Sequence, residues 1–265
     1  MSFHSFSEEF IESARNNKTL EFSFRESSKS SLLAKIRYWW GWLVASVLLL
    51  FVGIPTLIFF WLIRRKTWMY PLANLGARIW LAANGAKVKV IGREKLDENK
   101  QYIFISNHRS YLDTAAMFCF AGKRLGIIAK KELLKVPVLG QGMGFVNVIA
   151  IDRSNPERAL ASMQKAREIV ESGYSFGVFA EGTRAMPGQL LPFKKGAFHL
   201  AIQTATDIAP IAIKNTDIMM GKKSGKSFPG EIRMVFLDPI EIEGKSVNEL
   251  LSETRLAIAK ELASD

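Results

Sequence analysis

Residues 38–63 form the longest stretch of the chain without a charged side chain, and they limit its possible folds more than any other feature. A helix needs about 20 apolar residues to cross the hydrocarbon core of a bilayer, and this stretch is longer. Trp39, Trp40 and Trp42 at one end and Trp61 at the other are typical of the two membrane interfaces. No small-residue cleavage site follows, which argues against a signal peptide. We therefore predict a membrane-embedded segment rather than a soluble core helix.

Two paths of this segment through the bilayer are compatible with the sequence. Gly53, Ile54 and Pro55 lie past its middle, and proline removes a helical hydrogen bond. The positive-inside rule gives only a weak preference for orientation, because basic residues flank both ends: Lys35, Arg37, Arg64, Arg65 and Lys66. One hypothesis is that the segment bends at Gly53 to Pro55 and returns to the same leaflet, and the alternative is a full span.

The chain divides into three parts around this segment. Residues 1–37, rich in serine, are expected to form a mobile or surface-bound tail of unknown purpose. Residues 38–84 form the membrane-embedded or interfacial helical part. After the apolar stretch, Leu72, Leu75 and Ile79 repeat at helical spacing, which predicts an amphipathic helix. From residue 85 to 265, apolar strand-like runs alternate with helix-like segments, which predicts an α/β domain with functional loops at its strand ends. The predicted strands cover 88–90, 102–105, 125–129, 145–151, 174–180, 208–213 and 232–237.

The balance of charged residues points to an anionic partner. The sequence has 36 basic and 25 acidic residues, a net charge of +11. Such a charge favours nucleic acid, acidic lipid headgroups or a phosphorylated substrate, and a nucleic-acid binder would not explain residues 38–63. The single cysteine, Cys119, cannot form an intrachain disulfide, and its apolar surroundings predict a buried, inert thiol.

His108 is the best candidate for a catalytic group among the three histidines. It directly follows the buried strand at 102–105, and Asp113 lies about one helical turn further on. A carboxylate there can reach one imidazole nitrogen, set the tautomer and stabilise the imidazolium, leaving the other nitrogen to accept a proton. The alternative is that His108 caps a helix and Asp113 is a solvated charge. His199, in an apolar helix-like stretch, is expected to be a packed structural residue.

A second strand end carries groups suited to an anion. Glu181, Gly182, Thr183 and Arg184 follow the strand at 174–180; glycine allows close backbone approach, and arginine can bind two phosphate oxygens. We expect Arg153, after another strand, and Lys195 to join this site, although each could be a solvated surface charge. The segment 221–227 has only three residues between its glycines, so it is predicted to be an exposed basic loop rather than a nucleotide phosphate loop.

Together these motifs resemble the glycerolipid acyltransferases with a His-x4-Asp motif, in particular the bacterial 1-acyl-glycerol-3-phosphate acyltransferases (lysophosphatidic acid acyltransferases). The resemblance rests on the order of several blocks: Asn-His-Arg-Ser-Tyr-Leu-Asp at 107–113, Ala-Lys-Lys-Glu-Leu at 129–133, Phe-Ala-Glu-Gly-Thr-Arg at 179–184, Phe-Lys-Lys-Gly at 193–196 and Ile-Ala-Pro-Ile at 208–211. It covers roughly residues 70–240 and implies an α/β fold, a mixed sheet flanked by helices as in glycerol-phosphate acyltransferases.

The resemblance implies an O-acyltransferase of phospholipid biosynthesis at the inner (cytoplasmic) membrane, with the catalytic domain facing the cytoplasm. An acyl group would pass from acyl-CoA or acyl-acyl carrier protein to the sn-2 hydroxyl of 1-acyl-glycerol-3-phosphate, giving phosphatidic acid. His108 would be the general base, Asp113 its orienter, and Arg184 a phosphate clamp assisted by Arg153, Glu181, Gly182, Thr183 and Lys195. Neither a metal nor another cofactor is expected, nor is nucleic acid a partner. Glycerol-3-phosphate or another lysolipid such as a lyso-ornithine lipid stays open as acceptor, as does a non-catalytic lipid-binding protein.

Overall fold

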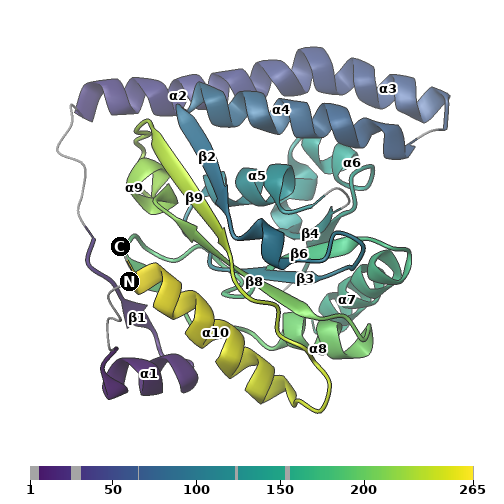
Figure 1. Cartoon of the computed structure of the whole chain (residues 1–265). Helices are drawn as coiled ribbons and strands as arrows, with labels where there is room; N and C mark the ends of the chain where they lie inside the picture. The colour runs from purple at the N-terminus through teal and green to yellow at the C-terminus, as the bar shows by residue number, and fades with distance from the viewer. Residues whose placement is uncertain (1–5, 25–30, 65, 123–124, 153–155, 265) are drawn as a thin grey trace.

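The chain folds into an α/β domain with a long helical hairpin, residues 31–64 and 66–83, along one side (Figure 1). The computed structural model describes residues 6–24, 31–64, 66–122, 125–152 and 156–264. The helices are α1 (Glu8–Arg15), α2 (Ser31–Val47), the π-helix η1 (Leu48–Gly53), α3 (Ile54–Leu62), η2 (Lys66–Met69), α4 (Tyr70–Ala83), η3 (Arg93–Lys95), α5 (Tyr111–Phe120), η4 (Lys131–Lys135), α6 (Leu139–Met143), α7 (Pro156–Glu171), α8 (Gly196–Gln203), α9 (Thr216–Met220) and α10 (Val247–Ala263). The strands are β1 (Leu20–Glu21), β2 (Ala86–Ile91), β3 (Ile103–Ser106), β4 (Leu125–Lys130), β5 (Val148–Ile151), β6 (Ser175–Phe179), β7 (Gln189–Leu190), β8 (Ile208–Lys214) and β9 (Gly230–Phe236).

The main sheet has seven strands in the order β2-β9-β8-β3-β6-β4-β5. Its β8–β9 pair is antiparallel, and the five other pairs are parallel. The predicted mixed sheet flanked by helices is therefore confirmed, and each predicted strand segment contributes a strand. The strand predicted at 145–151 was too long. Residues 145–147 form turns before β5, and the positive φ of 57° at Asn147 is incompatible with an extended strand.

Both faces of the sheet are covered, which explains why its central strands are continuous apolar runs. All residues of β3 and β8 are buried. One core cluster packs α1, α7, α8 and α10 against one face, and a second packs α4, α5 and α9 against the other. Cys119 of α5 lies in the second cluster, where burial raises the pKa of its thiol to about 11. The thiol is buried, as predicted.

The apolar segment is one long helix from α2 through η1 to α3, and its outer side is exposed. The helix Leu32–Leu62 is long and apolar enough to cross a membrane: an 18-residue window within it has a mean hydropathy of 2.6, and 6% of that window is buried. The hypothesis of a reversal at Gly53 to Pro55 is wrong: a π-helical turn, η1, precedes Pro55, and the helix continues through Pro55 into α3. The chain reverses after Leu62, and α4 returns alongside (Figure 1).

The amino-terminal residues also differ from the expected tail. Residues 6–24, which we call the N-terminal arm, contain α1 and β1 and pack against the carboxyl-terminal helix α10 (Figure 1). The arm contributes the buried residues Ala14 and Leu20 to the core. These residues therefore belong to the α/β fold, although the hairpin separates them from it in sequence.

Candidate active site

The site is built where two neighbouring parallel strands end. Ser106 of β3 is paired with Phe179 of β6, so the residues that follow them, His108 and Glu181, emerge side by side. Asn107 continues the pairing of β3 to β8, because its side-chain amide donates to the carbonyl of Ile213 and its oxygen accepts from that residue's amide, both at 2.8 Å. This side-chain pairing holds the first turn after β3 close to the sheet.

His108 and Asp113 meet as their spacing predicted. The imidazole Nδ1 lies 3.0 Å from Asp113 Oδ2, and the same oxygen accepts the backbone amides of Arg109 at 2.6 Å and Ser110 at 2.7 Å. Asp113 is fully buried at the start of α5, which excludes a solvated charge, and it forms a capping box with Ser110. It therefore caps the helix and orients the histidine at once. The ring of His108 stacks on Phe179, with centroids 4.1 Å apart.

Glu181 supports the histidine from the other strand. Its carboxylate accepts the amide of His108 at 2.6 Å and the amide of Leu191 at 2.8 Å, and its side chain is almost completely buried. Desolvation raises the pKa of this carboxyl to about 8, although both amides act in the opposite direction. The expected contact of Glu181 with substrate does not fit this geometry, because both oxygens are taken up by the protein backbone.

Arg184 is well placed to bind an anion beside the histidine. Its guanidinium carbon lies 3.6 Å from the centroid of the Tyr111 ring, and Tyr111 in turn packs edge-on against Trp42 of α2, 5.4 Å away. The amide of the next residue, Ala185, donates to the carbonyl of His108 at 2.7 Å, which ties the two loops together. Within the described part of the chain, no carboxylate forms an ion pair with Arg184.

The remaining predicted site residues take three different positions. Gly182 has a positive φ of 71°, which favours glycine, and a Cβ there would lie 3.0 Å from the Lys194 side chain, which would have to shift slightly. Thr183 and Lys195 are exposed, and among the described residues no hydrogen bond joins the Lys195 side chain to this site. Their roles stay predictions. Arg153 lies outside the described residues.

Sequence reasoning missed several residues at this site. Arg109 is buried, forms an ion pair with Asp217 at 3.0 Å and donates from Nε to the carbonyl of Gln189 at 2.8 Å. Lys222, in the loop expected to be exposed, donates to the carbonyl of Arg184. His199, expected to be packed, is exposed on α8. A buried arginine next to His108 could not be distinguished from a surface charge by sequence pattern alone.

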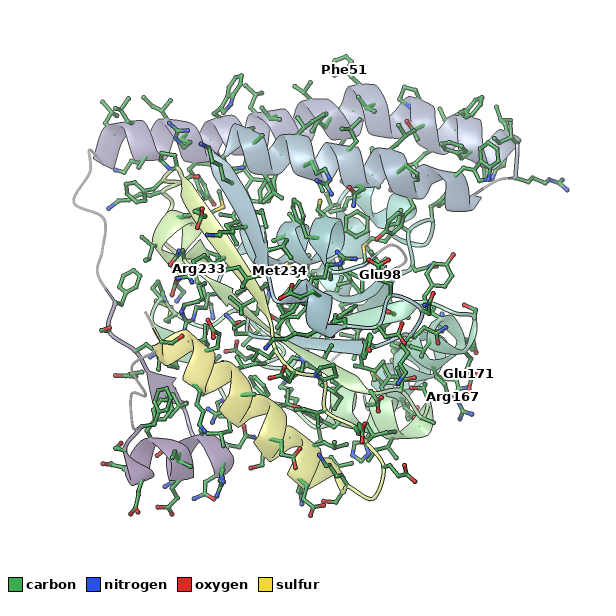
Figure 2. The ribbon with its side chains drawn as sticks, in the orientation of Figure 1. Phe51, Glu98, Arg167, Glu171, Arg233 and Met234 are labelled. Atoms are coloured by element: carbon green, nitrogen blue, oxygen red, sulfur yellow. The ribbon has the colours of Figure 1, made fainter. Side chains whose placement is uncertain are left out.

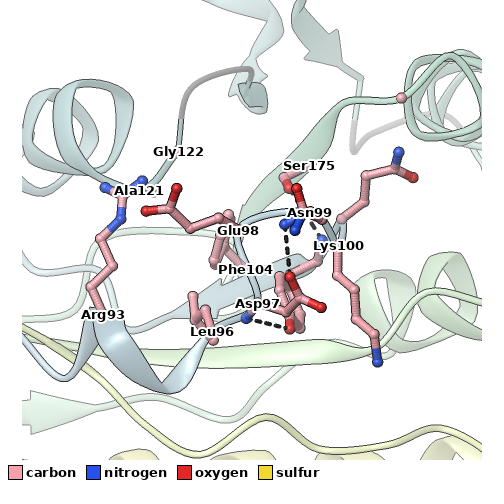
Figure 3. A pocket seen from close by; sticks show the side chains of 13 residues that line it. Arg93, Leu96, Asp97, Glu98, Asn99, Lys100, Phe104, Ala121, Gly122 and Ser175 are labelled. Atoms are coloured by element: carbon pink, nitrogen blue, oxygen red, sulfur yellow. Dashed lines mark hydrogen bonds between the residues drawn. The ribbon is translucent and has the colours of Figure 1, made fainter.

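A pocket of about 240 Å³ lies away from this site (Figure 3). Its lining includes Tyr102 and Ser175 at the amino-terminal ends of β3 and β6, whereas His108 and Glu181 follow their carboxyl ends. Parallel strands present functional loops at one edge, so this pocket belongs to the opposite edge of the sheet. Among the described residues, no group of three or more His, Cys, Asp or Glu side chains is arranged to hold a metal ion.

Known proteins share both the sequence blocks and the fold. Residues 87–214 match the model of the Acyltransferase family, and this range contains His108, Asp113, Glu181 and Arg184. This domain belongs to the acyltransferase family. The match over residues 87–214 confirms the resemblance that the ordered motifs indicated.

Curated proteins with similar sequences match about two thirds of this chain. An uncharacterized acyltransferase of Schizosaccharomyces pombe is 40% identical over 65% of this chain and 64% of its own length. A 1-acyl-sn-glycerol-3-phosphate acyltransferase of Limnanthes douglasii is 38% identical over 66% of this chain and 61% of its own. The human 1-acyl-sn-glycerol-3-phosphate acyltransferase alpha is 31% identical over 68% of this chain and 66% of its own. The chain thus spans slightly less than two thirds of these relatives.

The fold is also that of a solved acyltransferase. The crystal structure of the 1-acyl-sn-glycerophosphate acyltransferase of Thermotoga maritima superimposes with a TM-score of 0.74. It is 23% identical and covers 87% of this chain and 96% of its own length. This likeness includes more than the matched domain, and at such identity it concerns the fold alone.

Proposed function

We propose that this protein transfers a fatty acyl group from an acyl thioester to the sn-2 hydroxyl of 1-acyl-glycerol-3-phosphate, giving phosphatidic acid. The observation that carries the proposal is the 3.0 Å contact between His108 Nδ1 and the buried carboxylate of Asp113. Relatives named as 1-acyl-sn-glycerol-3-phosphate acyltransferases support the acceptor. Acyl-CoA and acyl-acyl carrier protein are both candidate donors.

The geometry favours direct transfer with His108 as general base. Asp113 takes the proton on Nδ1 as its hydrogen-bond partner, so Nε2 is the basic nitrogen that accepts the proton of the acceptor hydroxyl. The hydroxyl oxygen then forms a C–O bond to the thioester carbonyl carbon, and the C–S bond breaks. The thiolate that leaves accepts the proton from Nε2. A base held in this way typically contributes about 10²- to 10⁴-fold in rate.

The phosphate of the acceptor would bind at Arg184. A guanidinium that is stacked on Tyr111 has lost much of its freedom before the ligand arrives, and its fork matches two phosphate oxygens. The hydrogen bond from the Ala185 amide to the His108 carbonyl keeps this guanidinium at the same end of the sheet as the base. Phosphate and hydroxyl of one glycerol unit can therefore be held together.

The long apolar helix would anchor the protein to a membrane. Exposed aromatic and aliphatic side chains cover its outer side, and Figure 2 shows Phe51 pointing away from the α/β domain. The helix lies along that domain rather than projecting from it: the carbonyl of Ala34 accepts from Ser227, and Trp42 contacts Tyr111. Since the N-terminal arm also packs on the domain, we propose that the hairpin enters one leaflet, with both of its ends on the domain side.

Replacement of His108 tests the proposal most directly. His108→Ala should abolish nearly all acyl transfer by purified protein, while recovery in the membrane fraction stays unchanged. His199→Ala is the matched control, because His199 is exposed on α8; this variant should be fully active. The assay should offer both thioester donors and a panel of lysophospholipids. Substantial transfer by His108→Ala would refute the assignment of the base.

A further inference from the structure

The N-terminal arm forms a small second sheet with the loop that follows the Glu-Gly-Thr-Arg segment. Strand β1 pairs with β7 in an antiparallel register that sets Leu20 opposite Leu190 and Glu21 opposite Gln189. Both leucines are buried. Beyond this pair, the amide of Phe22 donates to the carbonyl of Gly188 at 2.7 Å. The arm thus lies along residues 188–190 of this loop.

Asn17 connects the arm to the far end of the same loop. Its Oδ1 accepts the amide of Phe193 at 2.6 Å, and its Nδ2 donates to the carbonyl of Phe193 at 2.9 Å. The side chain therefore replaces a strand neighbour for one residue of the loop. Asn17 has a positive φ of 56°, a conformation that asparagine tolerates better than most residues.

A buried arginine requires the arm to stay docked. Arg255 of α10 is completely buried, and its guanidinium donates to the arm carbonyls of Ser13 at 3.2 Å, Ala14 at 2.7 Å and Lys18. Burial lowers the pKa of Arg255 to about 10. If the arm left, these donors would lose their acceptors, which is costly for a buried charge. The arm is consequently an integral part of the fold.

The loop that the arm holds supplies the two backbone groups that support the catalytic histidine. The amide of Leu191 binds the carboxylate of Glu181, which binds the amide of His108. The carbonyl of Gln189 accepts from Arg109, the residue after the histidine. Two chains of hydrogen bonds therefore lead from the arm to both sides of His108.

We propose that the N-terminal arm is a positioning element of the active site, and that Asn17 is a positioning residue that holds His108 in register through Phe193, Leu191 and Glu181. This inference deepens the proposed function and rests on it. The arm precedes the membrane hairpin in sequence yet supports a base that follows it. The hairpin is thereby bracketed by two segments that must assemble on the same side.

The test replaces Asn17 by glycine in the full-length protein. Asn17→Gly removes both hydrogen bonds to Phe193 and keeps the positive φ without strain. Asn16→Gly is the matched control, since within the described part of the chain the Asn16 side chain makes just one hydrogen bond, an exposed one to Glu12 of α1. We expect kcat of Asn17→Gly to fall about tenfold at saturating substrates, because a misplacement of about 1 Å can cost about 10²-fold. KM for the thioester should stay within about twofold of the wild-type value.

Amide hydrogen exchange provides a second readout that does not depend on activity. In Asn17→Gly, peptides that contain His108 and residues 189–193 should exchange faster, and peptides from α7 should not. Unchanged exchange at His108, or a kcat equal to that of Asn16→Gly, would overturn the inference. So would a loss of kcat that matches the fraction of unfolded protein. If the wild type itself transfers no acyl group, the proposed function fails, and exchange at His108 still decides whether the arm positions that residue.

Discussion

Asp113→Asn separates the two tasks that Asp113 performs. All three hydrogen bonds of the carboxylate go to one oxygen, Oδ2, and come from the His108 ring and the amides of Arg109 and Ser110. The other oxygen, Oδ1, is buried and has no hydrogen-bond partner among the described residues. An asparagine can therefore place its carbonyl oxygen at the Oδ2 position and its amide group at the Oδ1 position. The helix cap and the imidazole tautomer are kept, and the negative charge is removed.

The structure sets the size of the expected effect. At 3.0 Å, a carboxylate and an imidazolium attract each other by about 5 kcal/mol at an effective dielectric constant of about 20. The neutral amide retains part of this, since a charged hydrogen bond exceeds a neutral one by about 1–2 kcal/mol. The loss of transition-state stabilisation lies between these values. At about 1.4 kcal/mol for each tenfold change, we expect kcat to fall about 10²- to 10³-fold.

The assay is the rate of transfer at saturating lysophosphatidate and acyl thioester, together with the thermal unfolding midpoint. Glu249→Gln is the matched control, because Ser246 and Glu249 form the same capping box at the start of α10. This control should leave kcat unchanged. If Asp113 only caps α5, Asp113→Asn should likewise retain its activity. A kcat above one tenth of the wild-type value would refute the reasoning.

Three further changes follow from the geometry of the site and of the hairpin. Arg184→Ala should raise KM for the phosphorylated acceptor about 10- to 100-fold, as expected for the loss of a charged hydrogen-bond pair. Arg167→Ala is the control, because Arg167 pairs with Glu171 on the surface (Figure 2) and its loss should leave this KM unchanged. Equal KM values for the two variants would contradict the role of Arg184 as a phosphate clamp. Glu181 holds its proton more tightly in the folded state, with a pKa of about 8, so its contribution to stability should fall as pH rises from about 5 to about 8 and then level off. Thermal unfolding of wild type and Glu181→Gln across this range measures it, and a constant difference between them would contradict the burial argument. Serine at both Phe51 and Ile58, which are exposed on the hairpin, should reduce recovery in the membrane fraction at least about tenfold, because each apolar side chain contributes about 1.5–3 kcal/mol when buried; unchanged recovery would contradict this anchor.

The parts of the site that sequence could predict are those encoded locally. His108 and Asp113 lie five positions apart across the start of α5. The capping box of Ser110 and Asp113 there fixes the placement of Asp113 relative to His108. The strands were predictable for a similar reason, because burial on both faces leaves continuous apolar runs. Glycine at 182 was predicted as a close-approach residue, and the structure gives it a positive φ of 71° and places the Lys194 side chain against it.

The rest depends on pairings between residues far apart in the chain. Glu181 was expected to face substrate because nothing near it in sequence reveals that its oxygens bind the amides of His108 and Leu191. Strand β1 has two residues and no periodicity, and its partner β7 lies on the far side of the hairpin in sequence. Pro55 looked like a bend, since sequence does not show that a π-helical turn accommodates it.

The contact of Arg184 with Tyr111 and of Tyr111 with Trp42 links the anion site to the apolar helix. A lysophosphatidate has its phosphate only a few bonds from the hydroxyl that is acylated, and its chain is insoluble in water. With the phosphate at Arg184 and the hydroxyl at His108, that chain can remain among lipids beside the hairpin. If the hairpin enters the membrane as proposed, the aromatic contact through Trp42 places the proposed acyl transfer at the membrane surface. This arrangement favours an acceptor that is taken from the bilayer and a product that is returned to it without crossing water.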